Sequence, residues 1–213
     1  MSFEAMVRLD LDAHMIKGRR IGLLGGSFNP AHEGHRHISL FALQRLRLDA
    51  VWWLVSPQNP LKPIHGMASF DDRFASAKEV AQHPRIEVSD IESRIGTRYT
   101  ADTLRVLHHR HSRHRFVWIM GADNLIQLSR WRDWTSIVEM VPIAVFARPG
   151  YSQRSLFSAA AHRYRRNRLP DHAATGLVDR KTPAWVFMHT PLHPASATEI
   201  RANRRHVSEG TSL

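Results

Sequence analysis

Short apolar runs alternate with longer amphipathic stretches along the chain. The run at 21–24 is followed by a glycine turn and then by apolar residues at helical spacing between residues 38 and 46. The next apolar run, 51–55, has the length and the β-favouring residues of a buried strand. A strand, a helix and a second strand in this order predict a βαβ unit, and therefore a parallel sheet.

The same alternation continues to residue 188. Further helices are expected at 69–81 and 100–109, and further strands at 86–88, 116–120, 143–147 and 185–188. Such an alternation is typical of a doubly wound parallel sheet with helices on both faces. We therefore predict an α/β fold of the Rossmann-like class, with an N-terminal extension at 1–19 and a single domain at 20–213.

Two irregular stretches interrupt this pattern. Residues 56–67 carry three prolines and a glycine directly after a predicted strand, where the ligand loops of parallel sheets lie. This stretch is therefore a candidate substrate loop. Residues 151–183 are basic and are expected to begin as a helix that Pro170 and Gly176 interrupt, and the sequence assigns them no chemistry.

Composition narrows the class of protein. A chain of 213 residues with 43% hydrophobic content can form one full-sized core. The absence of cysteine excludes disulfides, thiolate metal sites and a thiol nucleophile. No apolar run reaches the length of a membrane span, and charged residues among the first twenty argue against a signal peptide. We expect a cytoplasmic protein without a membrane association.

The net charge of +11 favours partners that carry phosphate. Eleven Lys and Arg stand against four Asp and Glu from residue 147 onward. A basic run of this kind is usually a solvated helix face, and it also attracts small polyphosphate substrates. A basic nucleic-acid-binding module is therefore kept as an alternative, but nucleic acid is not the expected partner.

The strongest chemical signal lies between the first strand and the first helix, in the stretch GGSFNPAHEGH. Gly25 and Gly26 let backbone N–H groups approach a polyphosphate beside Ser27, and the helix N-terminus behind them adds a partial positive charge. His32 and His35 are three residues apart, so both rings can face the same phosphates. Their imidazoles can donate hydrogen bonds to oxygens that gain charge as a phosphoanhydride breaks. The alternatives are that the histidines only cap the helix or bind a metal.

This stretch resembles the nucleotidyltransferase superfamily, whose hallmark is a His-x-Gly-His loop after the first strand. The second hallmark of that superfamily is present as SATEIR, which begins at Ser196. Ser196 and Glu199 have capping-box spacing, so they can open a helix. Within this resemblance, Ser196 and Thr198 are expected at the ATP phosphates, and Arg201 is expected to hold the departing pyrophosphate.

Within the superfamily, the chain resembles the bacterial nicotinate-mononucleotide adenylyltransferases. The resemblance implies transfer of the AMP part of ATP to nicotinate mononucleotide, with release of pyrophosphate. It also implies contacts from the intermediate motifs: Asn59 with the nicotinate site, Tyr99 and Thr100 with the nicotinate carboxylate, Gly121 and Asp123 with the adenosine ribose, and Trp131 with the pyridine ring.

Each intermediate motif also has a purely structural interpretation. Asn59 can form a turn, Thr100 can cap the following helix, and Trp131 can be a core aromatic paired with Trp134 at helical spacing. Asn29 stands where the superfamily often has Asp, which weakens any role for negative charge there. The histidines at 108, 109, 111 and 114 have no accompanying carboxylate, so no metal site is predicted.

The expected reaction needs few groups from the protein. The mononucleotide phosphate is mostly dianionic at pH 7, because its second pKa is about 6, and it can attack the α-phosphorus without a general base. Mg²⁺ is expected to arrive with ATP and to need no carboxylate cage. The remaining alternative is a related transferase that acts on another phosphate, such as phosphopantetheine. The sequence leaves the oligomeric state open.

Overall fold

The computed structural model describes residues 18–58 and 66–191. Within these ranges, seven strands form one sheet in the order β3-β2-β1-β4-β5-β7-β6, and every pairing between neighbouring strands is parallel. The strands are β1 (Arg20–Gly26), β2 (Ala50–Val55), β3 (Ile86–Ser89), β4 (Arg115–Gly121), β5 (Ile143–Phe146), β6 (Arg168–Leu169) and β7 (Trp185–Met188). The predicted doubly wound α/β fold is confirmed.

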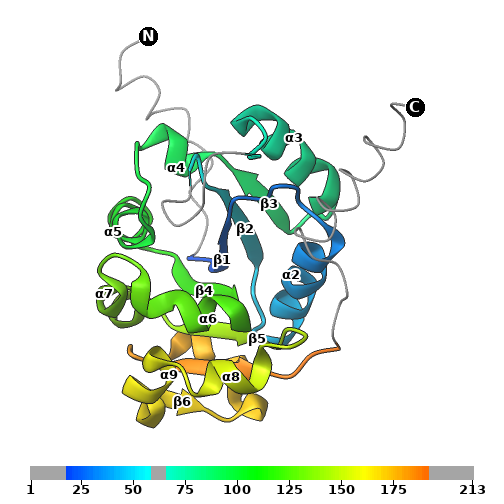
Figure 1. The fold of residues 1–213 in the computed structure, drawn as a ribbon. Helices are drawn as coiled ribbons and strands as arrows, with labels where there is room; N and C mark the ends of the chain where they lie inside the picture. Colours follow the sequence, from blue (N-terminus) through cyan, green and yellow to red (C-terminus); the bar gives the residue numbers. More distant parts are fainter. Residues whose placement is uncertain (1–17, 59–65, 192–213) are drawn as a thin grey trace, which may run out of the picture.

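Helices cover both faces of this sheet (Figure 1). One face packs against α2 (Glu33–Arg45), α3 (Phe70–Ala81) and the 3₁₀ segment η3 (Asp171–Asp179). The other face packs against α4 (Ile91–Arg94), α5 (Thr100–Arg110), α6 (Ala122–Gln127), η1 (Leu128–Arg130), α7 (Trp134–Met140), α8 (Ser152–Leu156) and α9 (Ala159–Arg163). A further 3₁₀ turn, η2 (Arg165–Asn167), precedes β6.

Two hydrophobic cores result, one on each face of the sheet. Along β4, Trp118 belongs to the core under α5 to α7, while its neighbours Val117 and Ile119 belong to the core under α2 and α3. Both faces are buried, so the central strands read as continuous apolar runs instead of alternating ones. Each fully buried Leu, Ile or Val contributes about 1.5–3 kcal/mol to the free energy of unfolding.

The winding direction of the fold changes between β1 and β4. The chain leaves β1 toward α2 on one face, and it leaves β4 toward α6 on the other. The two connections diverge at the carboxyl ends of these adjacent strands and leave a crevice there. In open α/β sheets such a crevice is where ligands bind.

The basic stretch 151–183 was expected to begin as a helix that is later interrupted, but it forms several short elements instead. It forms α8, α9, η2, β6 and η3, and its acidic side chains tie it to the sheet and α2. Asp179 pairs with Arg20 and Arg115, and Asp171 pairs with Arg45. These elements are too short for helical periodicity to identify them. Of the helices described, none has both the length and the apolarity that crossing a membrane requires.

Candidate active site

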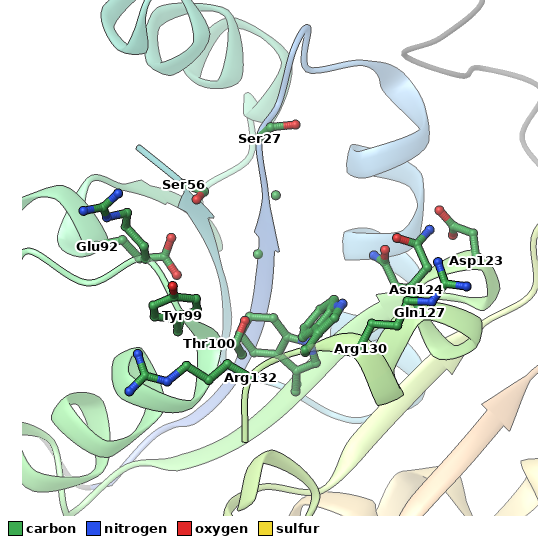
Figure 2. A pocket seen from close by; sticks show the side chains of 15 residues that line it. Ser27, Ser56, Glu92, Tyr99, Thr100, Asp123, Asn124, Gln127, Arg130 and Arg132 are labelled. Atoms are coloured by element: carbon green, nitrogen blue, oxygen red, sulfur yellow. The ribbon is translucent and has the colours of Figure 1, made fainter. Parts of the chain in front are cut away.

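A pocket of about 330 Å³ opens at the carboxyl ends of β1, β2 and β4. Figure 2 shows Glu92, Tyr99 and Arg132 on one side of it and Asp123, Asn124 and Gln127 on the other. The ends of β1 and β2 contribute Ser27 and Ser56. The pocket therefore occupies the crevice that the change in winding creates.

Two tryptophans form an aromatic corner in this pocket. The Trp118 and Trp131 rings meet edge to face, with centroids 6.3 Å apart and planes at 89°. A Cβ atom on Gly25 would lie 2.6 Å from the Trp118 ring, so only glycine allows β1 to pass this close. Within the described ranges the Trp131 and Trp134 rings make no contact with each other, and Trp134 packs against Tyr164 with centroids 5.9 Å apart. Both tryptophans are partly buried against the core of this face.

The histidine pair caps the first turn of α2 reciprocally. The His32 side chain accepts a hydrogen bond from the Gly34 N–H through Nδ1 at 3.1 Å, and the His35 Nδ1 accepts from the His32 N–H at 3.2 Å. The two rings lie 3.9 Å apart between centroids. A neutral imidazole whose Nδ1 accepts must carry its proton on Nε2. Capping thus fixes the tautomer and makes Nε2 of each ring the donor.

The backbone before these histidines is held in an unusual conformation. Phe28 has a φ of 47°, in the left-handed region that bulky residues avoid. Its ring stacks on Trp53 at 5.1 Å and contacts the His35 ring at 4.8 Å, both between centroids. Buried aromatic packing therefore holds the loop between β1 and α2 in a conformation that costs free energy locally.

A buried arginine joins the ends of β1 and β2. Arg73 of α3 is 2% exposed, and burial lowers its pKa. One guanidinium nitrogen donates to the carbonyls of Ser27 and Ser56, each at 2.7 Å, and the other donates to the carbonyl of Pro57 at 2.9 Å. Sequence reasoning missed this residue, because an arginine in a helix is usually part of a solvated face.

Asn29 ties the same loop to the segment before α3. Its Nδ2 donates to the Gly66 carbonyl, and its Oδ1 accepts from the Ala68 N–H, both at 3.2 Å. An aspartate could accept from Ala68 but could not donate to Gly66. The amide is therefore a structural bridge at a position where the superfamily often has a carboxylate.

Asp123 lies in the first turn of α6 and presents one carboxylate oxygen without a partner. Its Oδ2 accepts from Arg148 at 2.8 Å, whereas Oδ1 is buried and has no hydrogen bond within the described ranges. A Cβ atom on Gly121 would lie 2.5 Å from Oδ1, so a larger residue here would displace this carboxylate oxygen. A buried carboxylate oxygen that has no donor among the described residues is suited to a ligand hydroxyl. Sequence reasoning did not identify Arg148 either.

Glu92 of α4 is a buried carboxyl in the pocket wall that sequence reasoning did not identify. It is 5% exposed, and its Oε1 accepts from the Thr103 hydroxyl at 3.1 Å. Burial raises its pKa to about 7, against the opposing effect of hydrogen bonds with Thr103 and Ser56. Tyr99 is the N-cap residue of α5 and Thr100 is its first helical residue, and both line the pocket. Thr100 does not cap the helix.

Comparison with known proteins identifies the family. A sequence model of the cytidylyltransferase-like family matches residues 23–203. A protein of Parvibaculum lavamentivorans, named probable nicotinate-nucleotide adenylyltransferase, is 56% identical over 86% of this chain and 92% of its own length. A protein of the same name from Cereibacter sphaeroides is 51% identical over 87% of this chain and 97% of its own length. The chain belongs to the nicotinate-nucleotide adenylyltransferases of the cytidylyltransferase-like family.

A solved structure supports the fold of this adenylyltransferase. The nicotinic acid mononucleotide adenylyltransferase of Plasmodium falciparum, complexed with NaAD, superposes with a TM-score of 0.64. The match covers 86% of this chain and 83% of that one, at 16% sequence identity. At this identity the likeness concerns the fold alone.

The structure brings together many of the residues that the sequence singles out in this adenylyltransferase. Gly25, Gly26 and Ser27 line the pocket, as do Tyr99, Thr100, Asp123 and Trp131. His32 and His35 lie at the start of α2 and are not among the described residues that line this pocket. Asn59, Ser196, Thr198 and Arg201 lie outside the described residues.

The histidine-rich stretch before β4 contributes aromatic packing. His111 and His114 stack with centroids 5.7 Å apart, and each meets the Trp52 ring in a T-shaped arrangement. Burial lowers the pKa of His108, which packs against Phe116. In the ranges that the structure describes, no three His, Asp or Glu side chains are grouped to hold a metal ion.

Proposed function

We propose that this adenylyltransferase joins the phosphate of nicotinate mononucleotide to the AMP part of ATP and releases pyrophosphate. The observation that supports it most directly is the single pocket in which the glycine-rich end of β1 meets the aromatic corner and the start of α5. The first of these features suits a polyphosphate. The other two suit a flat ring that bears a carboxylate.

On the ATP side, the proposed contacts come from the loop between β1 and α2. The Nε2–H groups of His32 and His35 donate to non-bridging phosphate oxygens, and the tautomer required for this is the one that capping imposes. The backbone of Gly25 and Gly26, together with Ser27, lies beside the reacting phosphates. The acceptor phosphate is a dianion at pH 7, since its second pKa is about 6, so positioning and charge stabilisation suffice.

The adenosine ribose is assigned to the end of β4. Asp123 Oδ1 is buried and unpartnered among the described residues, and a ribose hydroxyl would supply the donor that it lacks. Arg148 orients this carboxylate through its hydrogen bond to Oδ2. Gly121 leaves the space in which Oδ1 lies.

On the mononucleotide side, Trp131 is proposed to stack on the pyridine ring in the corner with Trp118. The first N–H groups of α5 have no partner within their helix, so those at Tyr99 and Thr100 are suited to the nicotinate carboxylate. Asn59 remains a predicted contact of the nicotinate site. Ser196, Thr198 and Arg201 remain predicted contacts of the ATP phosphates and the departing pyrophosphate.

Mg²⁺ is proposed to enter with ATP, and the reaction is proposed to take place in the cytoplasm. The donors placed around the loop after β1 are backbone N–H groups and imidazoles, which suit phosphate oxygens and not a hard cation. When bound to the triphosphate, the ion would neutralise charge on its oxygens. The residues of this chain would then orient the nucleotide that carries it.

The proposed function is tested by a pyrophosphate-release assay with ATP, Mg²⁺ and a panel of acceptors. The panel contains nicotinate mononucleotide, nicotinamide mononucleotide and phosphopantetheine. Nicotinate mononucleotide is expected to give the highest kcat/KM. Turnover of phosphopantetheine alone would contradict the substrate assignment, and no pyrophosphate with any acceptor would contradict the reaction itself.

A further inference from the structure

Glu92 is a buried, pocket-facing carboxyl for which the proposed phosphate transfer has no use. It lies on α4, a single helical turn that packs against β2. Its backbone carbonyl accepts from the Thr97 N–H at 3.0 Å, and its side chain accepts from the Thr103 hydroxyl. Glu92 is therefore hydrogen-bonded to the chain both before and after the start of α5. The segment that leads into α5 ends in Tyr99 and Thr100.

The hydroxyl of Thr103 lies between Glu92 and the N-cap residue of α5. Its Oγ1 is 3.1 Å from Glu92 Oε1, 3.3 Å from the Tyr99 carbonyl and 3.0 Å from the Thr97 hydroxyl. A hydroxyl has one proton to donate, and an ionised carboxylate can only accept. With an ionised Glu92, the Thr103 hydroxyl therefore donates to the carboxylate. The Tyr99 carbonyl then keeps only its backbone donors, the N–H groups of Asp102 and Thr103.

Protonation of Glu92 reverses this hydrogen bond. A neutral carboxyl can donate to Thr103 Oγ1, and the Thr103 hydroxyl can then donate to the Tyr99 carbonyl. The chain of bonds then runs from Glu92 through Thr103 to the residue that opens α5. It also removes a buried negative charge from the pocket that a carboxylate is proposed to enter.

The other charged groups described around the pocket do not produce this pH-dependent exchange of hydrogen bonds. Arg98, Arg130 and Arg132 line the same pocket, and Arg73 stands behind Ser56. Arginines stay protonated at every pH at which the enzyme can be assayed. The other carboxylate among the described lining residues, Asp123, is paired with Arg148. Asp90, which precedes α4, and Arg94, its last residue, form an ion pair.

If the chain uses nicotinate mononucleotide, as proposed above, the geometry points to a proton-linked positioning role. We propose that Glu92 orders Tyr99 and Thr100 in its protonated form, so that the acid mononucleotide binds together with one proton. The pKa of about 7 that burial imposes places this change in the working range of the enzyme. Glu92 acts through Thr103 and is a positioning residue.

The first test measures KM between pH 7 and 9, above the second pKa of the substrate phosphate, which is about 6. The KM for nicotinate mononucleotide should rise at least about fivefold over this interval, and the KM for ATP should change less than about twofold. In Glu92→Gln, which stays neutral, the KM should stay low and flat. Glu79→Gln, an exposed position on α3, is the matched control and should follow the wild type. A flat wild-type profile, or the same rise in Glu92→Gln, would overturn the proposal.

A second measurement needs no variant. Calorimetric titration of the wild-type protein with nicotinate mononucleotide at pH 8, in buffers of different ionisation enthalpy, counts the protons taken up on binding. Uptake approaching one proton is expected, and uptake near zero would reject the role of Glu92. Binding and turnover without uptake would leave the proposed function standing, whereas failure to turn over this substrate would remove the function itself.

Discussion

His32 and His35 cap one helix for each other, each through Nδ1, so the two rings share a single tautomer with the proton on Nε2. The capping and phosphate-binding interpretations of this motif are therefore compatible. Capping uses one nitrogen of each ring, and the proposed phosphate contact uses the other. A substitution at either position should affect both stability and turnover.

We expect His35→Ala to lower kcat at least about 10²-fold, because a preorganised donor to the phosphates is removed. The lost cap should also lower the free energy of unfolding by about 1 kcal/mol, a fall of roughly 2–4 °C in the thermal midpoint. His35→Glu separates the two effects, since glutamate at this position of a capping box can restore the bond to the His32 N–H but has no donor for a phosphate oxygen. A variant that regains stability and also wild-type turnover would contradict the phosphate role.

Trp131→Ala should raise the KM for the mononucleotide at least about tenfold and leave the KM for ATP unchanged. The proposed stacking face touches only the pyridine ring, and the Trp118 ring at 89° would remain. Trp131→Phe, which keeps a flat face, should recover most of the loss. Steady-state kinetics with each substrate varied in turn decides this, and an equal rise in both KM values would indicate a core residue instead.

Nicotinate mononucleotide should exceed nicotinamide mononucleotide in kcat/KM by at least roughly 10²-fold. The N–H groups at the start of α5 suit both oxygens of a carboxylate, whereas the NH₂ group of a carboxamide would face another donor. The measurement uses saturating ATP and Mg²⁺ with each acceptor. A ratio near one would contradict the proposed preference for the acid but would leave the proposed adenylyl transfer standing.

Gly121→Ala should raise the KM for ATP at least about tenfold, since the loss of one buried charged hydrogen bond costs about 1.5–3 kcal/mol. The new Cβ atom would lie 2.5 Å from Asp123 Oδ1 and displace the acceptor proposed for the ribose. Gly176→Ala is the matched control, because a Cβ atom there meets nothing within 4 Å. Equal kinetics in the two variants would show that Asp123 does not contact the nucleotide.

Stability should fall as the pH rises toward 7, because of Glu92. Its pKa is 4.5 in the unfolded reference and about 7 in the fold, so between these values the folded state binds more protons. The contribution of Glu92 to the free energy of unfolding is therefore largest below pH 4.5. This contribution decreases by on the order of 3 kcal/mol by about pH 7. Between pH 5 and pH 8, the thermal midpoint should decrease more in the wild type than in Glu92→Gln. The two decreases should differ by roughly 5–10 °C. Equal differences would contradict the raised pKa.

The parts of the site that the sequence predicts are those carried by contiguous motifs on long, periodic elements. Gly25 to His35 joins a buried strand to a thirteen-residue helix, so the spacing alone locates the histidines at the helix start. The same holds for Thr100, which begins an eleven-residue helix after an irregular segment.

The residues that the sequence does not reveal act through contacts between distant segments. Arg73 lies in the first turn of the amphipathic helix α3, and its burial appears only when the ends of β1 and β2 converge on it. Glu92 belongs to a four-residue helix that carries no periodicity. Arg148 meets Asp123 across 25 residues of chain. Spacing along the chain cannot identify such pairs.

The hydrogen bonds of Arg73 have a consequence for how the two substrates affect each other. One guanidinium donates hydrogen bonds to carbonyls at the ends of both β1 and β2. It therefore links the loop proposed for the triphosphate to the start of the candidate substrate loop. A ligand that fixes the position of one strand end therefore also fixes the carbonyls at the other end. ATP and the mononucleotide should therefore bind with positive cooperativity even though neither need touch the arginine that couples them.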